Sequence, residues 1–348
     1  MNGLEPMRAT SLPEDPAGLP AFIVQQNEAS RLPHLFDWYR ARGVTRFYVV
    51  DNLSTDGSAD LLLAQPDVEP FRARGSYGKA RAGLDWAEAL MDRYADRRWC
   101  VHVDADELLV WPGRQDGGLP ALIARLEAEG AEAQRAMMLD MYPDGPLVDA
   151  AYSPGQPFLD VAPCFDAAPY WREPTPGQFP DYTIRGGVRA RLFYPELLAR
   201  GPGRRLRGIL RNQMWKLPAL RGTRIERALR DPVAPDLTKI PLKRWRAGMK
   251  HRGGPHRMDP LRLSRSSAIL LHFKFFADSA VRVNAQIAAG QHYQGGAEYR
   301  RYARLLSRDP RLSFAGPGTA RYAGPEDLER RGLMGMAGDT LAAAGAGA

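Results

Sequence analysis

The sequence predicts an α/β fold in which a mostly parallel central sheet is flanked by helices. In the first half of the chain, short apolar runs alternate with segments of helical periodicity, the order that parallel sheets with covering helices produce. Apolar residues make up 44% and charged residues 25% of the 348 residues, a composition typical of a globular protein with a sizeable core. No run of about 18 uncharged apolar residues occurs, so no membrane-spanning helix is expected.

The first elements form a strand–helix–strand unit. A buried strand is expected at 21–25 (AFIVQ), a short apolar run. A helix is expected over 31–42, because a serine can cap it, a glycine can end it, and four apolar residues lie on one face: Leu32, Leu35, Phe36 and Tyr39. The second strand, 47–50 (FYVV), leads directly into Asp51.

The unit continues with two helices and a third strand. A short helix is expected to begin near Ser58, and a longer one over 78–94 has apolar residues at helical spacing. The next strand, 99–103 (WCVHV), runs into the acidic sequence 104–107 (DADE). The resulting order, β-α-β-α-β, favours a parallel arrangement.

The second half follows a different pattern. A helix is expected over 119–129 and a strand over 136–141. Residues 142–187 are rich in Pro, Gly and aromatic residues and are too long for an ordinary connection, so we expect a functional or lid-like segment. The alternation in 188–194 (VRARLFY) predicts an exposed or edge strand. The remaining elements are a buried strand at 268–272 and helices near 279–289 and 297–307.

Composition divides the chain into one domain between two tails. Residues 1–20 are rich in Pro, Ala, Gly and acidic residues and are expected to be a disordered N-terminal tail; 335–348 are expected to be a flexible C-terminal tail. The residues between them, 21–334, are expected to form a single domain with halves at 21–118 and 119–334.

Charge is distributed unevenly. The net charge is +8, yet residues 185–275 alone contain 23 Lys and Arg against 5 Asp and Glu. This asymmetry suggests a polyanionic partner or an anionic membrane surface for the basic segment 185–275; the alternative is a solvated basic face. The two cysteines, Cys100 and Cys164, are too few for a disulfide framework, and the first residues lack the apolar segment of a secretory signal. A reduced, cytoplasmic setting is therefore expected.

Carboxylates follow three of the predicted strands. The first strand leads to Asn27 and Glu28, the second ends at Asp51, and the third ends at Asp104 and Asp106. Because ligands bind outside the carboxyl ends of parallel strands, these residues predict one acidic crevice. Carboxylate oxygens are the ligands that Mg²⁺ and Mn²⁺ prefer, and these ions are often shared with substrate phosphates. The alternative for the DxD sequence is an acidic surface loop.

Cationic and imidazole side chains could complete such a site. His272 ends a predicted strand and could join the metal ligands, although a hydrogen-bonded core histidine is the alternative; Lys274 could hold a phosphate oxygen. Lys239 lies in a Pro-containing basic segment (KIPLKR) suited to pyrophosphate. Lys79 and Arg81 lie at the start of the predicted helix over 78–94, a favourable place for phosphate. No P-loop and no GxGxxG sequence follows a strand, which disfavours ATP-type phosphate cradles and dinucleotides.

Four segments of the sequence resemble family 2 glycosyltransferases of GT-A fold, and in particular the bacterial branch related to family 92. They are FIVQQNEASRLPHLFDWYRARGVTRFYVVDNLSTDGS, HVDADELLV, KIPL and LLHFKF. The similarity covers roughly 21–305 and is strongest over 21–110 and 239–275. Gln26 departs from the pattern, because a basic residue is expected before Asn-Glu.

This resemblance implies a nucleotide-sugar donor, a UDP-sugar above all, held with Mn²⁺ or Mg²⁺. The half at 21–118 would bind the donor and the half at 119–334 the acceptor. Glu28 and Asp51 would contact the nucleoside, with Asp51 reading the base. Asp104 would lie near the ribose or the metal, Asp106 would be the main metal ligand, and His272 would be a later metal or phosphate contact with Lys274 beside it.

The resemblance also implies inversion at the transferred sugar. A carboxylate base must take the proton from the acceptor hydroxyl, and Asp140 and Asp144 in LDMYPDG are the best candidates. The acceptor would be a glycan, a lipid-linked molecule or another hydroxyl compound, read mainly by 142–235. Such an enzyme would be cytoplasmic and could contact an anionic membrane peripherally.

Two other classes of function share some of these features. One is a basic nucleic-acid- or membrane-surface-binding protein on an inactive GT-A scaffold; a nucleic-acid partner is not expected, because 185–275 lacks interleaved aromatic residues in an RNA-binding pattern. The other is a metal-dependent phosphohydrolase, which could use the same carboxylates.

Overall fold

A mixed sheet is the centre of the structure, a computed structural model that describes residues 3–198, 210, 219, 223–224, 233–252, 254–289 and 297–336. Ten strands form this sheet in the described part of the chain. They are β1 (Leu4–Pro6), β2 (Leu19–Gln25), β3 (Val44–Asp51), β4 (Val68–Ala73), β5 (Trp99–His102), β6 (Glu107–Val110), β7 (Ala133–Asp140), β11 (Thr238–Arg244), β12 (Leu263–His272) and β14 (Gly335–Met336).

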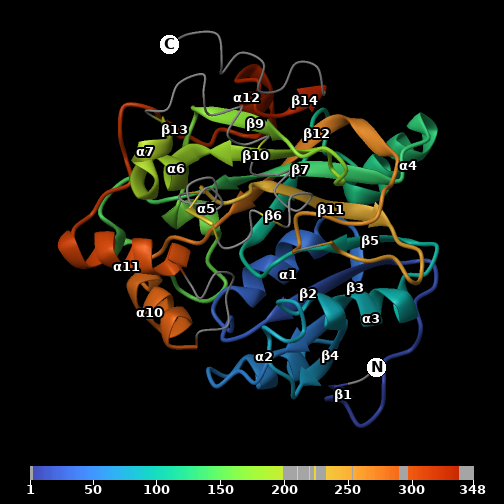
Figure 1. The fold of residues 1–348 in the computed structure, drawn as a ribbon. Helices are drawn as coiled ribbons and strands as arrows, with labels where there is room; N and C mark the ends of the chain where they lie inside the picture. The colour runs from blue at the N-terminus through green and yellow to red at the C-terminus, as the bar shows by residue number, and fades with distance from the viewer. Residues whose placement is uncertain are drawn as a thin grey trace.

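The sheet is mostly parallel, as predicted. Its strand order is β1-β4-β3-β2-β5-β11-β7-β12-β14, and β6 also pairs with β12 (Figure 1). The strands β4, β3, β2, β5, β7 and β12 all run in one direction, whereas β1, β6, β11 and β14 run the other way. Strands such as β2 and β3 are buried on both faces, which is why they read as nearly continuous apolar runs in the sequence.

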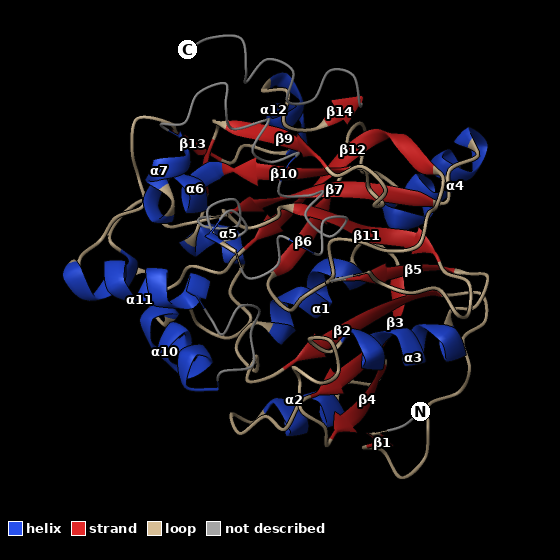
Figure 2. Cartoon of the chain, in the orientation of Figure 1, coloured by secondary structure: helices blue, strands red, loops and turns tan. Residues whose placement is uncertain are grey.

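Helices cover both faces of the sheet (Figure 2). The helices α1 (Leu32–Arg40), α2 (Ser58–Ala64) and α4 (Gly118–Glu129) pack in one core, which contains the four apolar residues predicted for the first helix. The helix α3 (Leu84–Tyr94) and the segment 245–261 pack in a second core on the other side. None of the helices in the described residues has the length and hydropathy of a membrane-spanning segment.

A third core lies beyond the ends of β7 and β12. It contains side chains of α6 (Gly187–Phe193), α7 (Pro195–Leu198), α10 (Ser279–Ala289) and α11 (Ala297–Arg308) around Phe275 and Phe314. Figure 1 shows α10 and α11 lying together on one side of the sheet. The remaining elements are the pairs β9 (Tyr170–Pro174) with β10 (Tyr182–Gly186) and β8 (Cys164–Asp166) with β13 (Thr319–Arg321), the short helices η1 (Leu147–Asp149) and α5 (Phe158–Val161), and α12 (Pro325–Arg330).

The helix predicted over 78–94 begins six residues later, at Leu84. Residues before it form a turn, because Arg81, Ala82 and Gly83 have positive φ angles of 49°, 59° and 81°. Successive residues in that region cannot continue a right-handed helix. Lys79 and Arg81 therefore do not occupy a helix N-terminus.

The edge strand predicted at 188–194 is wrong: this segment forms the helix α6. Its alternation misled because Arg189, taken as an outward-facing residue, is only 4% exposed and pairs with Asp140. A polar residue can lie on the buried side of a helix when it forms an ion pair there, and the spacing of apolar residues does not reveal such a pair.

Among the strands that were not predicted, β4 and β11 each contain an internal proline. Pro70 lies in β4, and Pro241 lies in β11, where the pairing with β7 shifts register between Lys239 and Leu242. A register irregularity of this kind lets a central strand contain a residue without a backbone donor.

The N-terminal segment also differs from the expected tail. Leu4–Pro6 form β1 against β4, and the side chain of Arg8 donates to the carbonyl oxygen of Val68 at 3.0 Å. At the other end, Gly335 and Met336 pair with β12, and the rest of the predicted tail lies outside the described residues.

Candidate functional site

The polar residues that end the parallel strands meet at one edge of the sheet. Asp51 ends β3, Asp140 ends β7 and His272 ends β12, while β5 runs directly into the DADE sequence. The antiparallel β11 begins at this same edge and brings Lys239 there. These strand ends therefore lie along the same edge of the sheet.

Asp106, His272 and Asp140 form the centre of the site. His272 lies opposite Asp140 in the parallel pair β12–β7, and its Nδ1 is 2.6 Å from Asp140 Oδ1. Its Nε2 is 3.6 Å from Asp106 Oδ2. The backbone N–H of Phe273 donates to the carbonyl oxygen of Asp106 at 2.8 Å, which fixes the DADE turn against the end of β12.

This arrangement sets the orientation of the imidazole. Burial opposes the charged form of Asp140, but Arg189 and His272 outweigh it and lower the pKa of Asp140 to about 2. An ionised Asp140 accepts a hydrogen bond, so Nδ1 of His272 carries the proton that it donates. In a neutral imidazole the Nε2 lone pair would then face the carboxylate of Asp106, and a cation between these two acceptors would be favoured.

A buried lysine holds the other acidic residues of the DADE sequence. Lys239 is 5% exposed, and its Nζ donates to Asp104 Oδ2 at 2.6 Å and to Glu107 Oε1 at 2.5 Å. Glu107 is completely buried, and its Oε2 accepts the backbone N–H of Asp104 at 3.0 Å. Burial raises the pKa of Glu107 and the negative Asp104 adds to it, while Lys239 opposes both. Lys239 and Glu107 thus hold the DADE turn in place through these hydrogen bonds on its buried side.

Arginines from a helix and a loop place positive charge near Asp106. Arg282 of α10 donates to Glu28 Oε1, and Arg31 donates to Asp278 at 3.1 and 3.2 Å. Burial disfavours the charged form of Asp106, but His272 and then these two arginines outweigh it and hold its pKa below the ordinary value. Burial likewise raises the pKa of Glu28, against the effect of both arginines. The site therefore favours an ionised Asp106.

The loops after β2 and β3, where the nucleoside was predicted to bind, are joined to each other by hydrogen bonds. Asn27 adopts a φ of 56°, its backbone N–H donates to Ser54 Oγ at 2.8 Å, and its Oδ1 accepts the N–H of Thr55 at 2.7 Å. Asp51 is 1% exposed, and its Oδ1 accepts from Gln25 Nε2 at 2.7 Å. Much of the NE and DNxSxDGS sequence thus builds the loops that surround Asp51.

The most informative residue missed by sequence reasoning is Glu298 of α11. Its Oε1 accepts from the hydroxyl of Tyr302 and lies 3.5 Å from Arg189 Nη1 and 3.8 Å from Lys274 Nζ. The side chain is 31% exposed. Burial opposes its ionisation, but Lys274 and Arg189 outweigh it and lower the pKa of Glu298. No motif surrounds this residue, so nothing in the sequence marked it as a site residue.

Three other predicted residues lie apart from this cluster or at its margin. Arg81 donates to Asp85 at 2.7 Å, to Glu88 at 2.6 Å and to the carbonyl oxygen of His251 at 2.8 Å, so it is part of a separate network. Lys79 is exposed in the turn before α3. Asp144 is 68% exposed and pairs with the exposed Arg321 at 3.3 Å.

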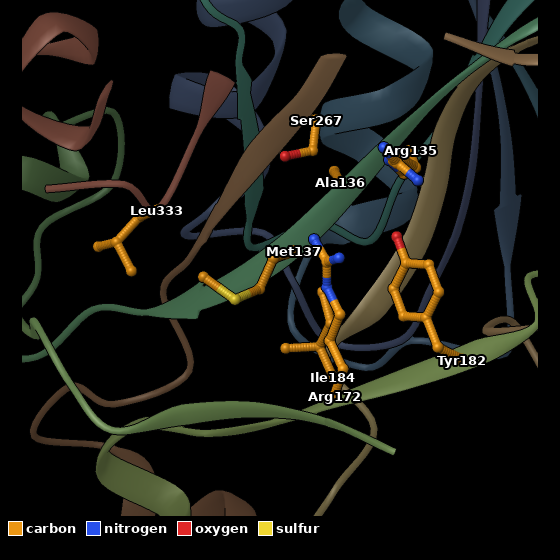
Figure 3. A pocket seen from close by; sticks show the side chains of 8 residues that line it. All are labelled: Arg135, Ala136, Met137, Arg172, Tyr182, Ile184, Ser267 and Leu333. Atoms are coloured by element: carbon orange, nitrogen blue, oxygen red, sulfur yellow. The ribbon is translucent and has the colours of Figure 1, made fainter. Parts of the chain in front are cut away.

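Two of the cavities on the described surface bear on the site. One, of about 70 Å³, opens beside Asp104 and Lys239 and extends toward Lys243. The other, of about 10 Å³, lies between β7 and the β9–β10 pair, where Arg172 and Tyr182 rise toward β7 (Figure 3). The second has room for about one water molecule, so it is too small for a substrate.

The residues present fit a divalent cation held by few protein ligands. No cluster of three or more His, Cys, Asp or Glu side chains in the described part of the chain is arranged to hold a metal ion. Asp106 Oδ2 and His272 Nε2, at 3.6 Å, are however close enough for both to contact one ion. The hydrogen bond from His272 to Asp140 is the kind of support that metal-binding histidines have. Asp104 is held by Lys239 instead.

Comparison with known proteins gives no functional assignment. No family model and no curated protein matches the chain. A 4-diphosphocytidyl-2C-methyl-D-erythritol synthase is 17% identical with a TM-score of 0.26, and the match covers 40% of this chain and 65% of that protein. A UDP-glucose pyrophosphorylase from Acinetobacter baumanii is 11% identical with a TM-score of 0.25, covering 38% of this chain and 59% of that protein. Such low scores carry no argument about function, so the proposal below depends on the site itself.

Proposed function

We propose that this protein is a metal-dependent glycosyltransferase of GT-A type that moves a sugar from a nucleotide-sugar donor to a hydroxyl acceptor. The observation that supports this most is the Asp106–His272 pair, 3.6 Å apart and oriented by Asp140 at the carboxyl ends of the strands. The sequence resemblance to family 2 glycosyltransferases, on the same DADE and LLHFKF segments, supports the same reading.

In this proposal Asp106 and His272 bind Mn²⁺ or Mg²⁺. Both ions accept one or two protein carboxylates and are completed by water and substrate phosphates, so an open pair of ligands suits them. When bound, the cation would neutralise the charge that develops on the leaving diphosphate. Asp104 stays with Lys239 and helps to shape the mouth of the site.

The donor would lie across the strand ends. Its nucleoside, uridine above all, would be placed over the braced loops around Asn27 and Asp51, and its diphosphate near the cation. Lys274 and Arg282 would supply positive charge near Asp106: after His272 and Arg31, Arg282 helps to lower the pKa of Asp106 against burial, and Asp106 adds to the effects of Tyr299 and Glu298 that raise the pKa of Lys274. Guanidinium and ammonium groups bind phosphate oxygens well.

Glu298 is the proposed catalytic base in place of Asp140. Both oxygens of Asp140 are engaged, by His272 at 2.6 Å and by Arg189 at 2.7 Å, and the residue is 3% exposed. A base must reach the acceptor hydroxyl. Glu298 is partly exposed and belongs to the same network through Arg189. Its carboxylate would accept the hydroxyl proton as the sugar is transferred with inversion.

The acceptor is proposed to be a glycan or a lipid-linked molecule bound on the side of α6, α10 and α11. A peripheral membrane contact through the basic segment 185–275 remains part of this proposal. The arginines expected to make that contact, Arg204, Arg205 and Arg207, lie outside the described residues.

The proposal is tested by Asp106→Asn, which removes one negative charge and hardly changes shape. The variant should bind UDP normally without metal but lose the Mn²⁺-dependent gain in affinity, measured by calorimetry with and without Mn²⁺. Asp37→Asn, at a carboxylate 71% exposed on α1, is the matched control and should behave as the wild type.

Product analysis then separates transfer from hydrolysis. Wild-type protein incubated with a UDP-sugar and Mn²⁺ should release UDP much faster when an acceptor is present, whereas a phosphohydrolase would not need one. Normal Mn²⁺-dependent turnover by Asp106→Asn would contradict the proposal.

A further inference from the structure

A cavity beside the proposed metal site ends at a buried lysine. This Lys243 cavity has a volume of about 70 Å³, enough for several water molecules or one tetrahedral oxyanion. It is lined by the turn before α3, by the end of β5 and by β11, and the polar side chains that the argument uses are His102, Asp104, Lys239 and Lys243.

Lys243 is a buried cation without a carboxylate partner. It is 1% exposed, and its Nζ donates to the carbonyl oxygen of Ile240 at 3.0 Å and lies 3.4 Å from His102 Nδ1. No carboxylate oxygen of the described residues lies within 4.0 Å of it. Burial lowers the pKa of Lys243 to about 8, which is the expected effect on an ammonium group without a counter-ion.

The carboxylates near the cavity already pair with other cations. Glu88, behind His251, accepts from that histidine and from Arg81 and lies 3.1 Å from Lys250. At the mouth of the cavity, Asp104 accepts from Lys239. The charged side chains that line the cavity are thus two lysines and one aspartate, and the ammonium of Lys243 has no negative charge of its own.

The second polar side chain of the cavity, His102, is oriented as a hydrogen-bond donor. Burial lowers the pKa of His102 well below its ordinary value, so the ring is neutral. Because a protonated Lys243 can only donate to His102 Nδ1, the ring proton lies on Nε2. A neutral histidine donor beside an ammonium is a combination that accommodates anions and not cations.

We propose that the Lys243 cavity is a binding site for a phosphate-type oxyanion that enters past Asp104 and Lys239 and pairs with the ammonium of Lys243. Such a group can come from two sources, free inorganic phosphate or the phosphate of a nucleotide. This inference goes beyond glycosyl transfer and does not require it, because the site lies on the α3 side of the sheet and uses none of the proposed metal ligands.

Calorimetry in the presence of EDTA tests the site without any metal. Inorganic phosphate and UDP are each titrated into the full-length wild type, into Lys243→Met and into Arg244→Met. The methionine keeps the length of the lysine side chain, and the neighbouring exposed Arg244 provides a variant with the same loss of charge. Lys243→Met should weaken binding of at least one of the two probes about ten-fold or more, the effect of losing a hydrogen bond to a charged group. Arg244→Met should bind as the wild type.

The two probes distinguish the sources of the anion. Loss of phosphate binding in Lys243→Met would indicate a site for a free anion; loss of UDP binding alone would indicate a nucleotide phosphate. The inference is overturned if the wild type binds neither probe saturably, a result that needs no variant, or if Lys243→Met binds both probes as the wild type does. The gain in UDP affinity that Mn²⁺ gives to the wild type and not to Asp106→Asn is measured separately, so failure of the oxyanion site does not decide the metal-site proposal.

Discussion

Asp140→Asn should separate a positioning role from that of a catalytic base. An asparagine offers one acceptor oxygen where Asp140 offers two, so it cannot serve both His272 and Arg189. If its oxygen stays with Arg189, its amide faces His272 Nδ1 and forces the imidazole proton onto Nε2. The lone pair that faces Asp106 is then lost.

The cost to stability can be worked from the structure. The pKa of Asp140 falls from the ordinary 3.8 to about 2, which corresponds to about 2 kcal/mol of stability at neutral pH. Removing one partner of a buried ion pair typically costs about 3–5 kcal/mol. Arg189 keeps Glu298 at 3.5 Å, so we expect about 3 kcal/mol. Because the folded-state pKa is depressed, this contribution is present above about pH 4 and is lost as the pH falls toward 2.

Urea unfolding at pH 7 and at pH 3 measures the stability, and calorimetry measures Mn²⁺ affinity. Asp140→Asn should lower Mn²⁺ affinity about 10- to 100-fold, the usual effect of losing the carboxylate behind a metal-binding histidine. Asp144→Asn is the control, since its carboxylate is 68% exposed and should change stability by no more than about 0.5 kcal/mol. An Asp140→Asn protein with wild-type stability and wild-type Mn²⁺ affinity would refute the reasoning.

Three further changes test other parts of the structure. Glu88→Gln should lower the free energy of unfolding by about 1–2 kcal/mol at pH 7. Burial opposes the charged form of Glu88, but a hydrogen bond from His251 and two partly exposed cations outweigh it and lower the pKa of Glu88 to about 2. Thermal denaturation should therefore show the difference in stability between the variant and the wild type vanishing as the pH falls from 4.5 to 2. Gly186→Ala should cost about 2–4 kcal/mol in urea unfolding, since its Cβ would lie 2.3 Å from Pro169 O at a φ of +138°, whereas Gly145→Ala meets nothing within 4 Å and should be nearly neutral. Glu298→Gln should reduce kcat for sugar transfer at least about 100-fold while UDP affinity stays within about two-fold; equal losses in both would argue for a binding role.

The sequence predicted the site residues best where one strand alone determines where a residue lies. Parallel strands buried on both faces read as apolar runs, so the strand ends that place Asp51, Asp106 and His272 were predicted, and the structure brings them to one edge. The helices of the first half followed from apolar residues at helical spacing, apart from the turn before α3, where Arg81 and Ala82 take positive φ angles.

The site could not be completed from the sequence, because its remaining parts depend on contacts between distant segments. Arg189 reaches Asp140, and Arg282 reaches Glu28 from 254 residues away. Glu298 lies on an amphipathic helix that resembles any surface helix, and only its packing on α6 and Lys274 gives it a chemical environment. Propensity and spacing contain no information about such pairs, because their cost and benefit are determined by burial.

The charge asymmetry of the sequence has a structural explanation that changes its meaning. Much of the described part of the basic segment 185–275 faces inward and pairs with carboxylates from other segments. These pairs include Arg185 with Glu173, Arg189 with Asp140, Arg191 with Asp166 and Lys239 with Asp104 and Glu107. The fold thus brings this basic segment against carboxylates from other segments, and the buried charges of these pairs compensate one another. A local charge imbalance in the sequence therefore does not by itself define a basic surface. Lys243 differs from these residues because it is buried without a carboxylate, and this difference is what directs attention to a ligand.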